Sequence, residues 1–146
     1  MSINHIGFIG TGVMGEPMCA NLAGKCGLPV MAFDLDPAPL ARLAEAGVAT
    51  AKSVAALIEV ADLILLSLPG GKQLLSLCED ELLPQCRAGQ IIVDTGTSPV
   101  DLTRTLAAKF ADKGVAYADA PIARTRQAAQ SGTLSIMVGA GDELFS

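Results

Sequence analysis

The chain has 146 residues, of which 51% are apolar, 17% charged and 3% aromatic, a composition that suits one globular domain with an aliphatic core rather than a disordered segment. The formal net charge is −5 and no stretch is strongly basic, which argues against a nucleic-acid partner, because binding to a phosphate backbone needs clustered Lys and Arg. The longest apolar run is far too short to cross a bilayer, and no signal peptide is evident, so we expect a cytoplasmic protein with no membrane partner.

Short apolar runs alternate with stretches of helical periodicity along the whole chain, as the two residue periods require. In chain order they predict a strand at 6–9, a helix at 13–26, a strand at 29–33, a helix to 46, a strand at 48–50, a helix after Ser53, a strand at 63–68, a helix at 72–83, a strand at 90–94, a helix after Ser98, and strands at 115–118 and 134–138.

Polar residues mark where several of these helices begin. Asp36 stands before a proline and Ser53 before an apolar helical stretch, so both are predicted N-caps. Ser98 with Asp101 reads as a short acidic capping box. The helix that follows has a buried stripe predicted at Leu102, Leu106 and Phe110.

The strands predicted at 6–9, 63–68 and 90–94 are nearly all apolar and do not alternate, which is typical of parallel strands buried on both faces. Repeated strand–helix–strand units imply right-handed crossovers. We therefore predict an α/β fold, namely a doubly wound, mostly parallel Rossmann sheet with helices on both faces. No shift in composition divides it, so residues 1–146 are predicted to form a single domain.

A glycine-rich turn follows the first predicted strand. Its six residues fit G-x-G-x-x-G and are Gly10, Thr11, Gly12, Val13, Met14 and Gly15. Between a strand and an amphipathic helix, the first glycine permits the tight turn, the second lets the backbone approach a pyrophosphate, and the third lets helix and strand pack closely. The N-terminus of the helix then offers N–H groups and the positive end of its dipole to phosphates.

An acidic residue stands where such a site needs one. Asp34 ends the second predicted strand, roughly 20 residues beyond the glycines. Its carboxylate can accept the ribose hydroxyls of an adenosine and would repel a 2′-phosphate, and Leu35 occupies the place where an NADP site usually has Arg. We therefore predict NAD rather than NADP as the cofactor, and regard Asp36 as a helix cap rather than a ribose ligand.

Two further loops follow the strands predicted at 63–68 and 90–94. One contains Leu68 and Pro69, and the other contains Thr97. Ligands of open α/β sheets bind at the carboxyl ends of the strands, so these residues are candidates for contact with the nicotinamide ribose. Ordinary loop chemistry explains them equally well.

Two longer motifs resemble the β-hydroxyacid dehydrogenases, the family typified by 3-hydroxyisobutyrate dehydrogenase. Residues 6–18 read IGFIGTGVMGEPM, similar to the cofactor fingerprint of the family. Residues 119–122 read DAPI and residues 131–139 read SGTLSIMVG, similar to its substrate-loop segment. The resemblance covers the whole chain and implies hydride transfer between NAD(H) and a small hydroxy acid or its semialdehyde.

Two departures from the family pattern concern its ligands. Family members usually have Ser-Gly-Gly where this chain has Ala123, Arg124 and Thr125. The Arg-Thr pair resembles the sulfolactaldehyde reductase branch, so these three residues are candidates for binding a small anionic substrate, a carboxylate or a sulfonate, through the guanidinium fork. Residues 94–99 look one residue shorter than in the family, which leaves the nicotinamide-side contacts open.

The resemblance implies a second, helical domain that supplies a catalytic Lys in a K-x-x-x-N pattern. None of the lysines here has Asn four residues on, and His5 precedes the first predicted strand, so we expect no catalytic residue in this chain. The four cysteines lack C-x-x-C spacing, so we expect reduced thiols and no metal site.

We expect this chain to be a fragment of a two-domain enzyme that is a homo-oligomer at full length. Two alternatives remain open at this point. One is another reductase that shares the domain, acting on a semialdehyde, glyoxylate, sulfolactaldehyde or an imine. The other is a non-catalytic NAD-binding module.

Overall fold

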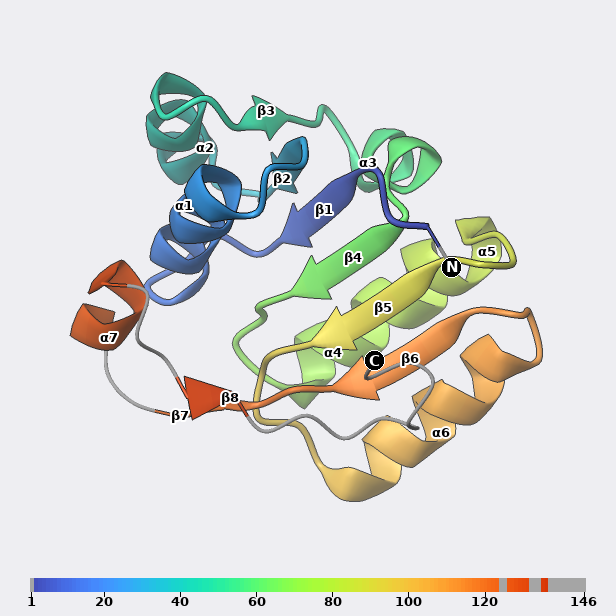
Figure 1. Ribbon diagram of the computed structural model, residues 1–146. Coiled ribbons are helices and arrows are strands. Elements are labelled where there is room, and N and C mark those ends of the chain that lie inside the picture. The colour runs from blue at the N-terminus through green and yellow to red at the C-terminus, as the bar shows by residue number, and fades with distance from the viewer. Residues whose placement is uncertain (1, 124–125, 132–134, 137–146) are drawn as a thin grey trace.

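A parallel β-sheet flanked by helices forms the computed structural model of the protein, which describes residues 2–123, 126–131 and 135–136 (Figure 1). The strands lie in the order β3-β2-β1-β4-β5-β6, and every neighbouring pair is parallel. The bounds are β1 (Ile6–Ile9), β2 (Val30–Phe33), β3 (Ala49–Thr50), β4 (Leu63–Leu66), β5 (Ile91–Asp94) and β6 (Ala116–Asp119). This order is that of the doubly wound dinucleotide-binding fold, so the predicted fold class is confirmed.

The helices divide between the two faces of the sheet (Figure 1). Side chains of α1 (Gly15–Lys25) and α2 (Pro37–Glu45) cluster with one face. Side chains of α3 (Val54–Val60), α4 (Gly71–Leu77) and α6 (Val100–Ala111) cluster with the other. Right-handed crossovers produce this division, because the chain moves one way from β1 to β3 and the opposite way from β4 to β6.

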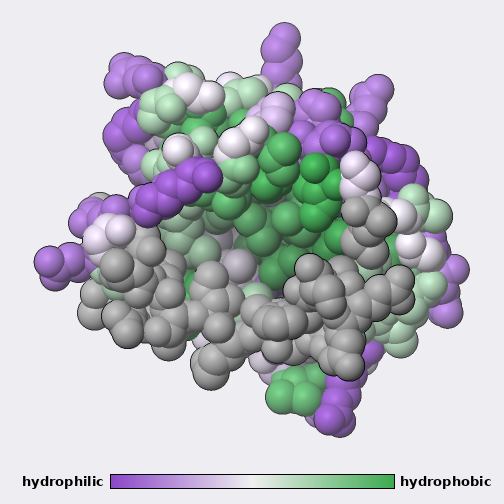
Figure 2. Space-filling view, viewed as in Figure 1, coloured by the Kyte–Doolittle hydropathy of each residue, from purple (hydrophilic) through white to green (hydrophobic). Residues whose placement is uncertain are grey.

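Strand residues alternate between the two apolar layers. On β4, Ile64 and Leu66 are fully buried among α3, α4 and α6, whereas Leu63 and Leu65 pack less completely on the α1 side. Figure 2 views the molecule from that side and shows apolar side chains gathered in a hollow near its centre. Both faces of the sheet are thus apolar, as the unalternating sequence of the strand requires.

Two of the three predicted caps are confirmed. The side chain of Asp36 accepts a hydrogen bond from the backbone N–H of Ala38, and that of Ser53 accepts from Ala56. The predicted capping box at Ser98 is wrong, because α6 begins after Pro99 with no side-chain cap, and the hydroxyl of Ser98 donates to Asp94 instead.

Most predicted elements differ from the structure by one or two residues at their ends, and two differ more. The helix predicted at 72–83 is α4 followed by a π-helical turn, η1 (Cys78–Leu82), and a short α5 (Leu83–Gln85). Pro84, which lacks an N–H, lies just beyond the π-turn. The strand predicted at 134–138 is seen as β8 (Ser135–Ile136), which pairs antiparallel with β7 (Ile122–Ala123) outside the main sheet; the rest of it lies outside the described residues.

In the part of the chain that the structure describes, no helix is long and apolar enough to span a membrane.

The predicted stripe on α6 is present, since Leu106 and Phe110 are fully buried and Leu102 packs against the same cluster. Phe110 also stacks on Tyr117 of β6, with ring centroids 5.5 Å apart.

Candidate cofactor-binding site

The turn between β1 and α1 is built so closely that two of its residues must be glycine. Gly10 has φ +97°, and an added Cβ would lie 2.1 Å from the carbonyl oxygen of Ser67, the residue after β4. A Cβ on Gly15 would lie 2.0 Å from the carbonyl oxygen of Gly10. These contacts hold the start of α1 against the carboxyl ends of β1 and β4, as predicted for the first and third glycines of the motif.

The middle of the same turn is open. A Cβ on Gly12 would meet nothing within 4 Å, so its lack of a side chain is not explained by packing within the protein. Val13 beside it leaves 64% of its surface exposed. Met14 is the N-cap residue of α1 and makes no side-chain cap hydrogen bond. An open backbone surface at a helix N-terminus is what a pyrophosphate requires.

Thr11 adds a buried hydroxyl without a hydrogen-bond partner to this turn. Its side chain is 1% exposed, and its hydroxyl oxygen is one of two buried side-chain atoms without a hydrogen-bond partner among the described residues. Buried hydroxyls are nearly always paired, so the unpaired state of Thr11 marks this turn as a place where a polar ligand or ordered water belongs. These features fit a dinucleotide.

Asp34 is held in place by two backbone amides. Its Oδ2 accepts a hydrogen bond of 2.6 Å from the N–H of Thr11, and its Oδ1 accepts one of 2.8 Å from the N–H of Asp36. Each carboxylate oxygen has two acceptor positions, so capacity for ribose hydroxyls remains. The contact joins the turns after β1 and β2, which brings Asp34 beside the glycines, while Leu35 is 92% exposed next to it.

An ion pair that the sequence did not reveal lies beside these turns. The guanidinium of Arg42 on α2 donates from Nε and Nη2 to the two carboxylate oxygens of Glu16 on α1, at 2.8 and 2.7 Å. The hydrogen bond with Glu16 raises the pKa of Arg42. The two residues are 26 positions apart, so no local spacing rule could have paired them.

A cleft of about 590 Å³ runs between α1, α2 and α7 (Arg126–Ser131) and reaches the glycine turn. The cleft is lined by residues of the glycine turn, by the cap residue of α2 and by the ion pair, namely Thr11, Gly12, Val13, Asp36, Glu16 and Arg42. Asp34, Leu68 and Thr97 do not line it, so the cleft covers one side of the glycine turn rather than the whole predicted site.

The loops after β4 and β5 meet at the same edge of the sheet. Thr95 donates from Oγ1 to the carbonyl of Leu66, which ties the two loops together, and Leu68 is half-buried while Pro69 and Thr97 are exposed. Their predicted contact with a nicotinamide ribose stays a prediction.

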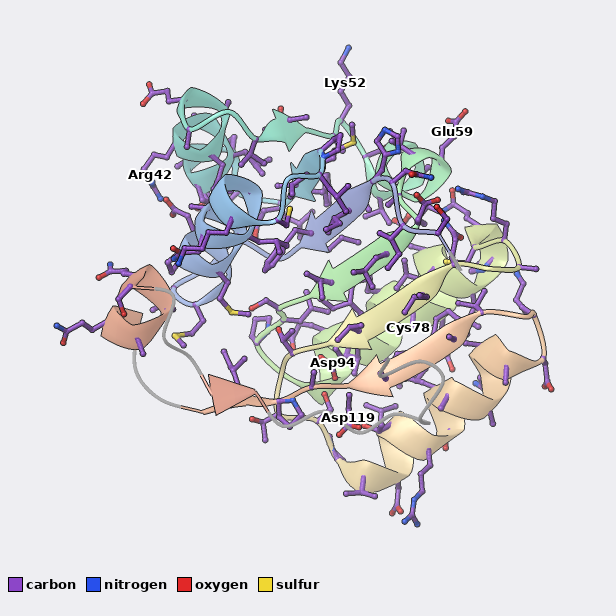
Figure 3. All side chains as sticks on the ribbon, in the orientation of Figure 1. Arg42, Lys52, Glu59, Cys78, Asp94 and Asp119 are labelled. Atoms are coloured by element: carbon purple, nitrogen blue, oxygen red, sulfur yellow. The ribbon has the colours of Figure 1, made fainter. Side chains whose placement is uncertain are left out.

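A buried carboxylate organises the loop after β5. Asp94 is 1% exposed and accepts hydrogen bonds from the N–H of Gly96 at 2.9 Å and the hydroxyl of Ser98 at 2.7 Å. Burial raises the pKa of Asp94, and the nearby charge of Asp119 adds to the effect. Asp119 is its register partner on β6, and Figure 3 shows both at the carboxyl ends of their strands. Sequence analysis missed Asp94 because its role depends on burial.

The predicted substrate loop is only partly described. Ala123 ends β7, and Arg124 and Thr125 lie outside the described residues. The helix that follows them, α7, is tied to α1 by Asn21, whose side-chain amide donates to the carbonyls of Ala129 and Gln130 at 2.7 and 3.0 Å. Sequence reasoning did not single out Asn21.

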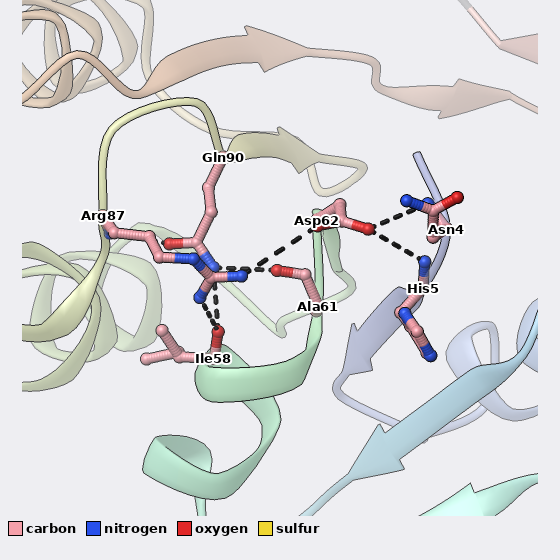
Figure 4. Close-up of polar contacts among 7 residues, drawn as sticks. All are labelled: Asn4, His5, Ile58, Ala61, Asp62, Arg87 and Gln90. Atoms are coloured by element: carbon pink, nitrogen blue, oxygen red, sulfur yellow. Dashed lines mark hydrogen bonds and ion pairs between the residues drawn. The ribbon is translucent and has the colours of Figure 1, made fainter. Parts of the chain in front are cut away.

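Other reactive residue types lie away from this edge. Backbone amides of Asn4 and His5 donate to Asp62, which also faces Arg87, at the amino ends of the strands (Figure 4). Burial raises the pKa of the thiols of Cys19 and Cys78 to about 12, so neither is a thiolate at neutral pH. Across the residues described, no three His, Cys, Asp or Glu side chains gather as a metal site.

Comparison with known proteins agrees with this geometry. Residues 5–146 match the family described as the NAD binding domain of 6-phosphogluconate dehydrogenase. The chain is 37% identical over 142 residues to 2-(hydroxymethyl)glutarate dehydrogenase of Eubacterium barkeri, covering 96% of this chain and 47% of that protein. It is 36% identical to 3-hydroxyisobutyrate dehydrogenase of Pseudomonas aeruginosa, covering 99% of this chain and 49% of that protein.

A solved structure is similar over the same extent. The 3-hydroxyisobutyrate dehydrogenase of Mycobacterium tuberculosis, determined with L-serine, superposes with a TM-score of 0.91 at 31% identity and covers 99% of this chain and 49% of its own. The chain thus spans about half the length of the relatives it matches. It belongs to the family described as the NAD binding domain of 6-phosphogluconate dehydrogenase, and over this domain it is similar to 3-hydroxyisobutyrate dehydrogenases.

Proposed function

We propose that this domain binds NAD(H) in preference to NADP(H) and serves an oxidoreductase that transfers a hydride to or from a small hydroxy acid or its semialdehyde. The observation that carries the proposal is the carboxylate of Asp34, which two backbone amides hold beside the open glycine turn. A fixed carboxylate with spare acceptor positions suits ribose hydroxyls and disfavours a 2′-phosphate.

The residues divide by the part of the cofactor that each would contact. Backbone N–H groups from Gly12 to Gly15 would bind the pyrophosphate, and Asp34 the adenosine ribose, with the exposed side chain of Leu35 against the adenosine. Leu68, Pro69 and Thr97 would face the nicotinamide ribose. When bound, the cofactor supplies the hydride chemistry, and the protein orients it.

The substrate proposal rests on relatives and on one loop. The names of the relatives describe dehydrogenases of hydroxy acids, and the M. tuberculosis relative was determined with L-serine. We propose that Ala123, Arg124 and Thr125 contact the anionic end of such a substrate, a carboxylate or sulfonate, because the guanidinium of Arg offers two parallel donors. The proton to or from the substrate oxygen would move through a Lys outside these 146 residues. We also propose that the full-length enzyme is a homo-oligomer and that it is cytoplasmic.

A titration with reduced cofactors tests the proposal. The chain is titrated with NADH and with NADPH by nicotinamide fluorescence, together with Asp34→Ala and with Asp112→Ala, which removes the same charge at the far end of α6. We expect the wild type and Asp112→Ala to prefer NADH, and Asp34→Ala to lose about tenfold or more in NADH affinity, the loss of a charged hydrogen-bond acceptor.

Two outcomes would reject the proposal. If the wild type binds neither cofactor, then the glycine turn is structural. If Asp34→Ala is folded, by circular dichroism and thermal unfolding, yet keeps the wild-type preference between the cofactors, then Asp34 does not read the ribose.

A further inference from the structure

Arg42 is the one cationic side chain among the described residues that line the cleft beside the glycine turn. Sites for NADP commonly place an Arg near the end of the second strand, where it accommodates the 2′-phosphate. The sequence has Leu35 directly after Asp34 and therefore lacks that feature. The fold nevertheless brings Arg42, which lies further along α2, to the cleft beside the glycine turn (Figure 3).

Glu16 of α1 pairs with one edge of this guanidinium. Both oxygens of its carboxylate accept from the guanidinium, at 2.7 and 2.8 Å. This is the fork-to-fork geometry that a phosphate would also use. Glu16 and a 2′-phosphate would therefore compete for one set of donors.

The charges around the cleft strengthen that competition. Glu16, Asp36 and Arg42 line the cleft, and Asp34 is held between them and the glycine turn by its hydrogen bonds to Thr11 and Asp36. Among the described residues of the cleft, Arg42 is then outnumbered by carboxylates, which disfavours a phosphate monoester carrying a charge of about −1.5 to −2. Without Glu16, a guanidinium is left unpaired beside the same carboxylates.

The arginine side chain has the freedom to use such an opening. Its side chain is 60% exposed in the ion pair, whereas that of Glu16 is 26% exposed. A long, exposed side chain can turn toward a new anion with little repacking, because its charged group is already in water.

We infer that Glu16 is a specificity-determining residue, which enforces the preference for NAD(H) by holding Arg42 in an ion pair and so denying its guanidinium to the 2′-phosphate of NADP(H). The inference rests on the proposed function, since it presumes that the adenosine half of the cofactor binds at Asp34. It adds a second determinant of preference to Asp34, on a different helix.

Substitutions that separate the two partners provide the test. NADH and NADPH affinities are measured for the wild type, Glu16→Gln, Arg42→Gln and the double variant, with Glu45→Gln as a control that removes the same charge at the end of α2. We expect Glu16→Gln to raise NADPH affinity about five- to tenfold while changing NADH affinity less than about twofold, with the gain shrinking as salt is added. The double variant should lose the gain, and Glu45→Gln should resemble the wild type.

Each failure has its own meaning. An unchanged ratio of NADPH to NADH affinity in folded Glu16→Gln would overturn the inference, as would a gain that persists in the double variant, because Glu16 would then act by repulsion alone. Glu16→Ala provides the same test if the Gln variant is unstable. A wild type that binds neither cofactor would reject the proposed function itself.

Discussion

Substituting Gly12 and Gly15 separately by Ala would distinguish the folding role of the glycine turn from its binding role. An added Cβ on Gly15 would lie 2.0 Å from the carbonyl oxygen of Gly10, more than 1 Å inside an ordinary contact between carbon and oxygen at about 3.3 Å. Backbone must move to relieve this clash, and forced shifts in a packed region cost about 1–3 kcal/mol. Gly15→Ala should therefore lower the free energy of unfolding by roughly 3 kcal/mol and also weaken NADH binding.

Gly12→Ala should behave differently. A Cβ there meets nothing within 4 Å, and the residue does not have a positive φ, so the free energy of unfolding should stay within about 1 kcal/mol of the wild type or rise slightly through lower entropy of the unfolded chain. The new methyl would nevertheless stand where the pyrophosphate approaches the backbone, and NADH affinity should fall about tenfold or more.

Urea unfolding followed by circular dichroism measures the first quantity, and NADH fluorescence titration measures the second. The reasoning is refuted if Gly12→Ala binds NADH as tightly as the wild type, because the open backbone would then face no ligand. It is also refuted if Gly15→Ala is as stable as the wild type.

Three further predictions concern stability. Burial raises the pKa of Asp94, so the folded state binds this proton more tightly than the unfolded chain does. The resulting contribution to stability is lost as pH rises from 3.8 through the raised pKa. In urea unfolding, Asp94→Asn should therefore gain stability relative to the wild type as pH rises through that range, whereas exposed Asp101→Asn should not. Phe110→Ala should cost about 3–5 kcal/mol, against about 0.5 kcal/mol for exposed Val100→Ala, and equal costs in thermal unfolding would contradict the packing seen. Asn21→Ala, which removes donors to the last carbonyls of α7, should speed hydrogen exchange in α7 but not in α6.

Local patterns were sufficient for most of the fold. The sequence predicted β1 with its observed bounds, and the caps at Asp36 and Ser53, because an unalternating apolar run and a polar residue before a helix are both patterns of neighbouring residues. Prediction failed at Ser98, because the N-cap of α6 is Pro99 and the hydroxyl of Ser98 donates to Asp94 instead. The π-turn after Leu77 was also missed, since helical periodicity does not distinguish a widened turn.

The candidate site divides in the same way. By itself, the sequence determined the glycine turn and the acidic residue at the end of β2, because each has a fixed spacing from a strand and a helix. Only the tertiary structure decided that the N–H of Thr11 holds the carboxylate of Asp34, that Glu16 pairs with Arg42, and that Asp94 is buried beside Asp119. Those contacts join segments that crossovers bring together at one edge of the sheet. The interaction energy between charged groups there depends on their burial and their distance, which spacing along the chain does not encode.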